Sequence, residues 1–187
     1  MRDVFQKNRW LIPALIATLA ITLGVNSDNP DSQIKGDMVS ALGINAELGP
    51  DQPTKFLNTT SSRVGQFTVS TDYTGPIGVT ALQFDSMGSL RSKIIKRYNL
   101  ALLSIEVGGV VIGNGEVWEY NYGRLQQTVE LETPIIVDKN NPVTFEVYAN
   151  LVNQSGSTFG IVLSGLENSQ IFEEVSVVGP HRVITSN

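Results

Sequence analysis

The chain has 187 residues, which is enough for one domain of ordinary size and a leader. Its 13 Lys and Arg residues against 18 Asp and Glu residues give a net charge of −5, and because an acidic body repels phosphate backbones we expect no nucleic-acid partner. The chain has no cysteine, which excludes disulfides, thiolate metal sites, cysteine nucleophiles and a lipid-modified N-terminal cysteine.

Residues 1–25 read as a signal peptide or a signal-anchor helix. No charged residue occurs from Trp10 to Ser27, and basic residues precede this run. Its apolar core, Leu11 to Val25, would span about 22 Å as a helix, less than the roughly 30 Å of a bilayer core, so cleavage and retention both stay open. Either alternative predicts an extracytoplasmic body, membrane-anchored or secreted. In an anchor, the membrane contacts would be Trp10, Leu11, Ile12, Leu15, Ile16, Leu19, Ile21, Leu23 and Val25.

Residues 26–63 are expected to form a polar spacer. Pro30, Pro50 and Pro53 occur among many Asp, Asn, Ser and Thr residues, a composition typical of linkers. A short helix over Ser32–Leu42 is possible, but we favour a solvated stalk, since such a segment buries too little apolar surface to order itself.

Residues 64–187 are expected to form a β-domain, and Leu125–Val152 is its clearest part. Two strands alternate apolar and polar residues on either side of a Pro-bracketed connection, a period that a helix does not fit. The alternation predicts one inward face made of Leu125, Gln127, Val129 and Leu131, and a second made of Val143, Phe145, Val147, Ala149 and Leu151.

Further strands are predicted on both sides of this stretch. The segments 65–73 and 78–86 come first, and the irregular apolar spacing of the second, Val79, Leu82 and Phe84, suggests a β-bulge. Gly108-Gly109 predicts a two-residue hairpin, and Gly113-Asn114-Gly115 a second turn. Later strands are expected at 116–120, 157–167, 170–179 and 181–186. About eight strands without helical periodicity predict an antiparallel β-sandwich, with a barrel as the alternative.

The segment from Gln66 to Leu151 resembles the immunoglobulin-like β-sandwich modules of secreted and surface proteins of bacteria, including candidate-phylum lineages. The resemblance rests on QFTVSTDYTGPIGVTALQF, SIEVGGVVIGNG and VELETPIIVDKNNPVTFEVYANL, with its Tyr148-Ala149 pair, and on the closing VSVVGPHRVI. It implies exposure on the cell surface and a structural or adhesive role, and it carries over no binding residue. Two features depart from such modules: the chain contains one copy, and residues 85–99 look inserted.

Motifs for catalysis, cofactors and metals are missing from the sequence. His181 is the only histidine, and neither G-x-S-x-G nor H-E-x-x-H occurs. Asp138–Asn141 lacks the spacing of a calcium loop, and the glycines at 108–115 lack the lysine of a phosphate-binding loop. Glu130, Glu132 and Glu146 are expected on the solvated faces of neighbouring strands. We therefore expect a protein that is not an enzyme and has no cofactor or metal.

Two groups of residues are candidates for binding. Arg91, Lys93, Lys96 and Arg97 form a basic cluster, and Leu90, Ile94 and Tyr98 follow at i, i+4 and i+8, so a short amphipathic helix could meet lipid head groups or an anionic wall polymer. The alternative is a solvated insertion between strands. Trp118, Tyr120 and Tyr122 alternate onto one side of the expected strand, where exposed aromatic rings would contact a glycan.

The sequence as a whole predicts an exported, non-enzymatic surface protein with a structural or adhesive role. Its partners would be the membrane, if the leader is retained, and other envelope proteins or further copies of itself. Two alternatives stay open: a pilin-like filament subunit built on the N-terminal helix, with assembly by a donated strand from Val64–Thr71, and a carbohydrate-binding surface module.

Overall fold

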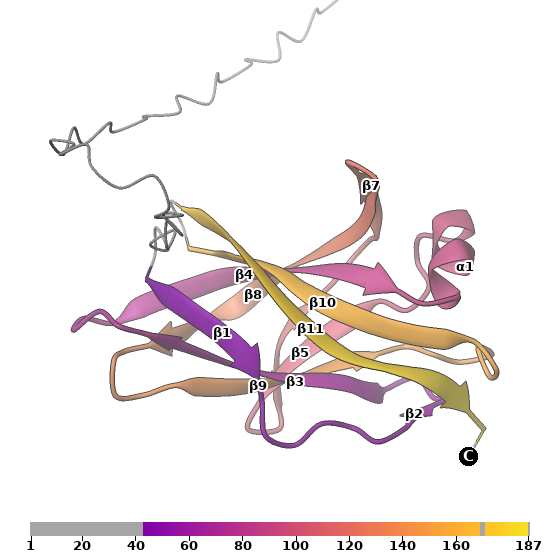
Figure 1. Ribbon diagram of the computed structural model, residues 1–187, viewed down its shortest axis with the longest axis horizontal. Helices are drawn as coiled ribbons and strands as arrows, with labels where there is room; N and C mark the ends of the chain where they lie inside the picture. Colours follow the sequence, from indigo (N-terminus) through magenta and orange to yellow (C-terminus); the bar gives the residue numbers. More distant parts are fainter. Residues whose placement is uncertain (1–42, 169–170, 187) are drawn as a thin grey trace, which may run out of the picture. The chain divides into compact units, whose positions relative to one another are not determined.

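The computed structural model describes residues 43–168 and 171–186 (Figure 1). Within these ranges it contains eleven strands and one short helix, so the prediction of an all-β fold is confirmed. The strands are β1 Ile44–Leu48, β2 Phe56–Leu57, β3 Ser62–Thr71, β4 Ile77–Met87, β5 Leu103–Val107, β6 Val110–Asn114, β7 Glu119–Asn121, β8 Arg124–Val137, β9 Val143–Ala149, β10 Thr158–Glu167 and β11 Phe172–Thr185, and the helix is α1 Leu90–Lys96.

The strands form one curled sheet in the order β1, β3, β9, β5, β6, β8, β4, β10, β11, β2, with β7 paired to β8 beside this path. All the pairings are antiparallel except that of β2 with β11. In the part of the chain that the structure describes, β6 and β8 are joined only where Gly113 pairs with Leu131. The sheet bends there, so that its two halves pack face to face.

The core lies between these two halves. Phe67 of β3 stacks on Phe145 of the neighbouring β9 at 5.8 Å between ring centroids, and it meets Phe84 of β4, from the opposite half, at 6.0 Å. All three rings are fully buried. Burial of each contributes about 1.5–3 kcal/mol, so these contacts hold the two halves together.

The two strands of Leu125–Val152 have the predicted inward faces, but they are not neighbours. Leu125, Gln127 and Val129 of β8 are buried, and β9 buries Phe145 and Val147. However, β8 pairs with β4, β6 and β7, whereas β9 pairs with β3 and β5. The expectation that Glu130 and Glu132 lie on a strand next to that of Glu146 is therefore wrong, because pairing partners are set by the curl of the sheet and not by order along the chain.

The predicted bulge and one of the two predicted turns are confirmed. The register between β4 and β8 shifts between Val79 and Ala81. Gly108 and Gly109 connect β5 to β6 with φ of 59° and 80°, values that favour glycine. The turn expected at Gly113 is wrong, because β6 continues to Asn114. A Cβ atom at Gly113 would lie 2.7 Å from the carbonyl oxygen of Glu130, so glycine is needed there for close approach to β8.

Both β1 and β2 lie within the range 26–63 that we expected to be a spacer, so the β-domain starts at or before Ile44. β1 pairs with β3 from Ile44↔Thr71 to Leu48↔Phe67. The predictions for residues 1–25 and for a helix at 32–42 lie outside the described residues. Among the described residues, no helix has the length and apolar character needed to cross a bilayer.

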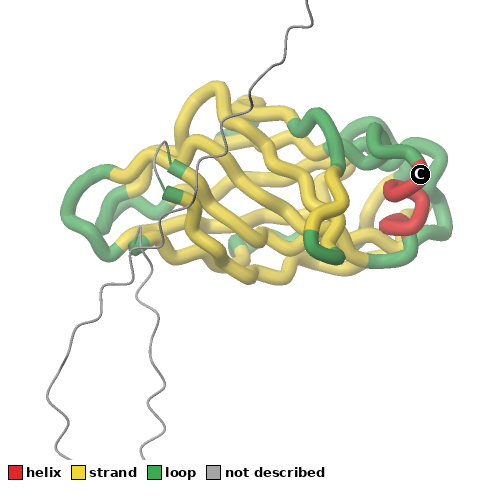
Figure 2. The backbone as a smooth tube through the Cα atoms, turned by 90° about the horizontal axis from the view of Figure 1, so that it is seen from above, coloured by secondary structure: helices red, strands yellow, loops and turns green. Residues whose placement is uncertain are grey.

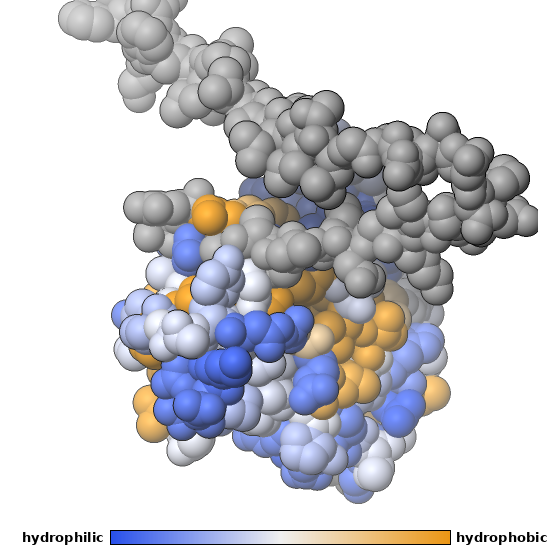
Figure 3. Space-filling view, turned by 60° about the vertical axis from the view of Figure 1, so that its left-hand side comes forward, coloured by the Kyte–Doolittle hydropathy of each residue, from blue (hydrophilic) through white to orange (hydrophobic). Residues whose placement is uncertain are grey.

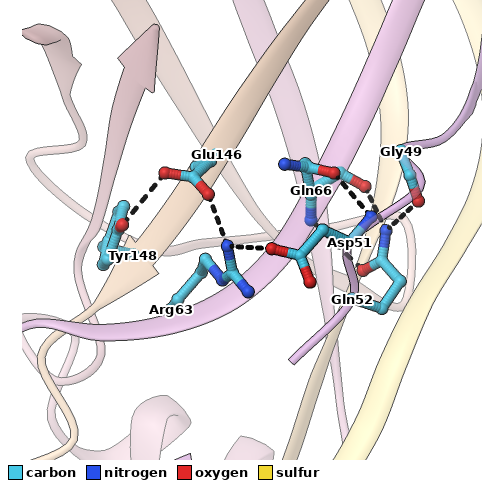
Figure 4. A network of polar contacts seen from close by, with 7 residues as sticks. All are labelled: Gly49, Asp51, Gln52, Arg63, Gln66, Glu146 and Tyr148. Carbon is cyan, nitrogen blue, oxygen red and sulfur yellow. Dashed lines mark hydrogen bonds and ion pairs between the residues drawn. The ribbon is translucent and has the colours of Figure 1, made fainter. Parts of the chain in front are cut away.

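A polar network fixes the connection from β1 to β2 against β3 and β9 (Figure 4). The side-chain amide of Gln52 donates to the carbonyl oxygens of Gly49, at 2.9 Å, and of Gln66, at 2.6 Å. Arg63 forms ion pairs with Asp51 at 3.0 Å and with Glu146 at 2.5 Å. The segment that we expected to be a stalk is thus held on the sheet by side chains of the sheet itself.

β3 is a central strand. It pairs with β1 on one side and with β9 on the other, and it buries Val64, Phe67 and Val69 completely. Within this chain β1 covers one edge of β3 from Phe67 to Thr71, and β9 covers the other from Ser62 to Val69. Assembly by donation of Val64–Thr71 to another subunit stays a prediction.

The surface of the described residues keeps some apolar side chains in contact with solvent. Val110, Ile136 and Val178 are more than half exposed. On the face shown in Figure 3, hydrophobic residues lie directly beside hydrophilic ones. Exposed apolar residues in such a mixture are ordinary for folded proteins.

Candidate binding groove on the outer face of the sheet

A polar groove runs over the outer face of β8, β4, β10 and the start of β11. It consists of two cavities of about 290 and 560 Å³, both lined by Gln83, Asn121 and Gln126. The smaller cavity is also lined by Asn114, Glu116, Val117, Glu119, Thr128 and Glu130, and the larger by Tyr122, Arg124, Ser164, Phe172 and Glu174. Because they share three lining residues, the two cavities are adjacent, and together they are called the groove.

Strand alternation builds the floor of the groove. Since Leu125, Gln127 and Val129 point into the core, Gln126 and Thr128 point outward. The register places Gln126 opposite Asp85 and Thr128 opposite Gln83 on β4. Four outward polar side chains therefore lie together at the centre of the sheet.

Hydrogen bonds fix this floor. The Gln126 amide donates to Asp85 Oδ1 at 2.9 Å, and the Ser164 hydroxyl donates to the same oxygen at 3.2 Å. Ser164 lies where the register of β10 shifts between Leu163 and Gly165, and this bulge brings its hydroxyl to the groove. The floor is ordered before any ligand binds, which lowers the entropic cost of binding.

One wall of the groove is the segment between β6 and β7, and Trp118 anchors it. The Trp118 ring is fully buried, and its Nε1 donates to the carbonyl oxygen of Ala101 at 3.1 Å. The Gly115 amide also donates to the carbonyl oxygen of Leu103 at 2.8 Å. These two hydrogen bonds and the buried ring hold residues 115–118 against the core, although the segment is not part of a strand. The side chains of Glu116, Val117 and Glu119 line the smaller cavity.

The prediction that Trp118, Tyr120 and Tyr122 present their rings together is wrong for Trp118. Alternation does not hold for this residue because β7 starts only at Glu119. Tyr120 is 58% exposed and Tyr122 is 98% exposed. Of the three, Tyr122 lines the groove, at the tip of the hairpin that joins β7 to β8, where it has a φ of 46°.

The groove carries mostly negative charge. Glu116, Glu119 and Glu130 line the smaller cavity. Arg124 is the one basic residue that lines either cavity in the described ranges, and acidic partners already engage it, Asp85 at 3.5 Å and Glu174 at 3.7 Å. The groove itself therefore disfavours an anionic ligand.

Amide, hydroxyl and carboxylate groups in a shallow groove are suited to a ligand rich in hydroxyl groups. Amides both donate and accept hydrogen bonds, and carboxylates accept them, so the lining can satisfy donors and acceptors alike. Tyr122 and the half-exposed Phe172 add aromatic surface at the larger cavity. Within the described part of the chain, no group of three or more His, Asp or Glu side chains is placed to hold a metal ion.

The basic cluster lies on α1 and on the residue that follows it. The predicted short helix is present, and its Leu90 and Ile94 are buried and fix it to the domain. The helix ends at Lys96, so Tyr98 lies beyond it and is 47% exposed, contrary to its expected place on the apolar face. Figure 2 shows α1 in red at one end of the strands, among connecting loops.

Two members of the cluster also make neutral hydrogen bonds. Arg91 Nη2 donates to the carbonyl oxygen of Gly123 at 2.6 Å, and Lys93 Nζ donates to the Ser157 hydroxyl at 2.7 Å. Lys96 and Arg97 are exposed. Among the residues that the structure describes, none of the four has an acidic partner within ion-pair distance.

Of the other residues that the sequence analysis considered, Glu130 lines the groove, whereas His181, Glu146 and Asp138 do not. His181 is exposed on β11. Glu146 is engaged by Arg63 and by the Tyr148 hydroxyl, which donates to it at 3.0 Å. Asp138 accepts hydrogen bonds from the side-chain amide of Asn141 and the backbone amide of Asn140, which lower the pKa of its carboxyl group. This arrangement is that of a connecting loop, as expected.

Sequence reasoning missed most of the groove residues, because they meet only through pairing between strands far apart in the chain. A signal does exist at the outward-facing positions Gln126 and Thr128 of β8 and Gln83 of β4, which carry amide and hydroxyl groups where long charged side chains are common on solvated strands. The missed residues are Gln83, Asp85, Asn114, Glu116, Val117, Glu119, Asn121, Arg124, Gln126, Thr128, Ser164, Phe172 and Glu174.

No family model and no curated protein matches this chain. Among solved structures, the chain is weakly similar to self-complemented MyfA, the major subunit of Myf fimbriae from Yersinia enterocolitica, crystallised in complex with galactose. The similarity covers 76% of this chain and 98% of that one, with 7% sequence identity and a TM-score of 0.24. A likeness of this size does not establish a shared function.

Proposed function

We propose that the protein is an exported, non-enzymatic adhesive protein of the cell surface that binds a carbohydrate in the groove. The single observation that carries this proposal is the groove itself, two adjacent polar cavities over β8, β4, β10 and the start of β11 whose floor is fixed by hydrogen bonds. Its lining combines amide, hydroxyl and carboxylate groups with an exposed tyrosine, which is the chemistry that recognises sugar hydroxyl groups and ring faces.

The fold and the leader are part of the same proposal. We take the two packed halves of the curled sheet as a variant of an immunoglobulin-like sandwich, supported by the contact of Phe67 with Phe84 between them. Export is supported by the uncharged run from Trp10 to Ser27. The intact mass of protein taken from its native cells tests the leader: a full-length mass in the detergent fraction means an anchor, and a mass that starts near Val25 or Asp28 in the soluble fraction means secretion.

A glycan array probed with the full-length chain tests the binding site. We expect selective binding, which Gln126→Ala abolishes because it removes an amide that both cavities share. Tyr122→Ala should weaken binding by about threefold to tenfold, which corresponds to the loss of one aromatic contact. Tyr73→Ala is the matched control, since Tyr73 is also an exposed tyrosine, at 54%, and lines neither cavity.

Two results would refute the proposal. One is an array without any bound glycan for a chain shown by circular dichroism to be folded. The other is binding that Gln126→Ala and Tyr73→Ala weaken equally, because the binding surface would then lie outside the groove.

A further inference from the structure

The groove and the basic cluster, which have opposite charges, lie next to each other. Arg91 of α1 donates its 2.6 Å hydrogen bond to the carbonyl oxygen of Gly123, and the preceding residue, Tyr122, lines the larger cavity. The hairpin of β7 and β8 is therefore tied to the helix, and both lie toward the same side in Figure 1. A ligand that extends past Tyr122 meets α1.

The helix is held firmly in this place. Leu90 and Ile94 are completely buried. On the N-terminal side of the helix, Ser89 and Thr158 hold each other reciprocally: the Ser89 amide donates to Thr158 Oγ1 at 2.8 Å, and the Thr158 amide donates to Ser89 Oγ at 2.9 Å. The basic side chains of α1 thus start from a rigid base, as a binding surface requires.

The charge on α1 is not neutralised by the protein. The helix has no acidic residue in its first turn, and no described residue forms an ion pair with Arg91, Lys93, Lys96 or Arg97. The chain as a whole has a net charge of −5, and Glu116, Glu119 and Glu130 line the groove. The site therefore repels anions at one end and attracts them at the other.

From this juxtaposition we infer that the ligand is a glycan chain with two unlike parts. An uncharged sugar unit occupies the groove, and an anionic substituent, a sulfate, phosphate or carboxylate group, lies beyond Tyr122 against the side chains of α1. Lys96 and Arg97, which are exposed and form no ion pair with a described residue, supply this charge. This inference rests on the proposed function and adds to it the class of glycan.

Matched pairs of glycans test the inference. The probes are the neutral oligosaccharides that the full-length chain binds on an array, each compared with the same oligosaccharide carrying one sulfate or phosphate group. We expect the substituted form to bind about tenfold more tightly at low salt, and this advantage to shrink as ionic strength rises, because solvent-exposed charges are screened.

Charge reversal locates the effect. The double variant Lys96→Glu, Arg97→Glu should lose the preference for the substituted glycan and keep the affinity for the neutral one, whereas Gln126→Ala should lose both. Lys55→Glu with Lys139→Glu is the matched control, because it makes the same two charge reversals at exposed positions outside the lining of the groove. Thermal unfolding confirms that each variant is folded.

The outcomes distinguish this inference from the proposed function. Equal binding of both forms, or a preference that charge reversal on α1 leaves intact, overturns the inference and leaves the proposed function standing. Binding of substituted glycans that persists in Gln126→Ala also overturns it, because α1 would then act as a general anion-binding surface. Absence of any glycan binding overturns both.

Discussion

The side chain of Gln52 occupies the position of a strand residue beside Gln66. Its Nε2 donates to the Gln66 carbonyl oxygen at 2.6 Å, and its Oε1 accepts from the Gln66 amide at 3.2 Å. The Gln66 side chain binds the same segment, because its Oε1 accepts a hydrogen bond from the Asp51 amide at 2.9 Å (Figure 4). The pairing of β1 with β3 ends at Leu48, and this amide pair satisfies the next backbone groups of β3.

Replacing Gln52 should therefore loosen the start of the domain. Gln52→Ala removes three hydrogen bonds and leaves the part-buried Gln66 amide without its partner, while the Gln66 carbonyl oxygen keeps the Gly49 amide as donor. We therefore expect a loss of about 1–3 kcal/mol in the free energy of unfolding, measured by urea denaturation. Asn45→Ala is a suitable control, since its amide makes one exposed hydrogen bond, to Asp72. Equal losses in the two variants would mean that Gln52 does not hold β1 in place.

Tyr148 should make stability depend on alkaline pH. Burial, followed by the hydrogen bond to Glu146, raises the pKa of its phenol above the ordinary value of 10.0. As the pH rises past that value, the unfolded chain loses this proton before the folded chain does. The stability linked to Tyr148 is thus fully present below pH 10 and is lost as the pH rises through the folded-state pKa.

Urea midpoints at pH 8 and pH 11 measure this effect. Tyr148→Phe should be somewhat less stable at pH 8, through loss of one hydrogen bond, and should lose less stability than the parent chain on moving to pH 11. Tyr120→Phe, at an exposed position, is the comparison. If the parent chain and Tyr148→Phe lose the same stability between the two pH values, the folded-state shift is absent.

Trp118 should support both the fold and the groove wall. Trp118→Ala empties a fully buried site and removes the bond to Ala101, and such truncations cost about 3–5 kcal/mol. In a Trp10→Phe background, Trp118 is the sole tryptophan, so its emission should be blue-shifted in the folded chain and shift to the red on unfolding. Emission typical of exposed tryptophan under native conditions would refute its buried position.

Gly113 should be intolerant of any side chain. A Cβ atom there would lie 2.7 Å from the Glu130 carbonyl oxygen and 2.9 Å from Leu131 Cδ2, so Gly113→Ala must push β6 away from β8, at a cost of about 1–3 kcal/mol. Gly75→Ala is the control, because a Cβ atom at Gly75 has nothing within 4 Å, and its effect should stay within about 0.5 kcal/mol. Similar unfolding midpoints for the two variants would contradict the close approach of the two strands.

The sequence predicts local structure well where one strand face is buried. The alternation in Leu125–Val152 identified the inward side chains of β8, including the polar Gln127, whose Oε1 accepts from the buried Leu103 amide at 2.8 Å. The same logic failed for Trp118, because residues 115–118 are outside any strand and have no fixed period of two.

Local sequence patterns could not predict the groove. Gln126 and Gln83 are 43 positions apart, and they come together only because β8 and β4 pair in one register. Likewise, the segment with Pro50 and Pro53 has the composition of a linker, yet Gln52 and Arg63 bind it to β3 and β9. Strand pairing between distant residues decided the first case, and side-chain hydrogen bonds and ion pairs between distant residues decided the second.

The single pairing of Gly113 with Leu131 sets how the domain would carry mechanical load. β1 belongs to one half of the sheet and the groove to the other, so tension between the N-terminal side of the domain and a bound ligand passes through the bend, through the short pairing of β2 with β11, or through the apolar core. Antiparallel strands within each half share long runs of hydrogen bonds, whereas one residue pair joins the halves across the bend. Under force the two halves would therefore separate before either half lost its strands, and the contact of Phe67 with Phe84 would resist this separation.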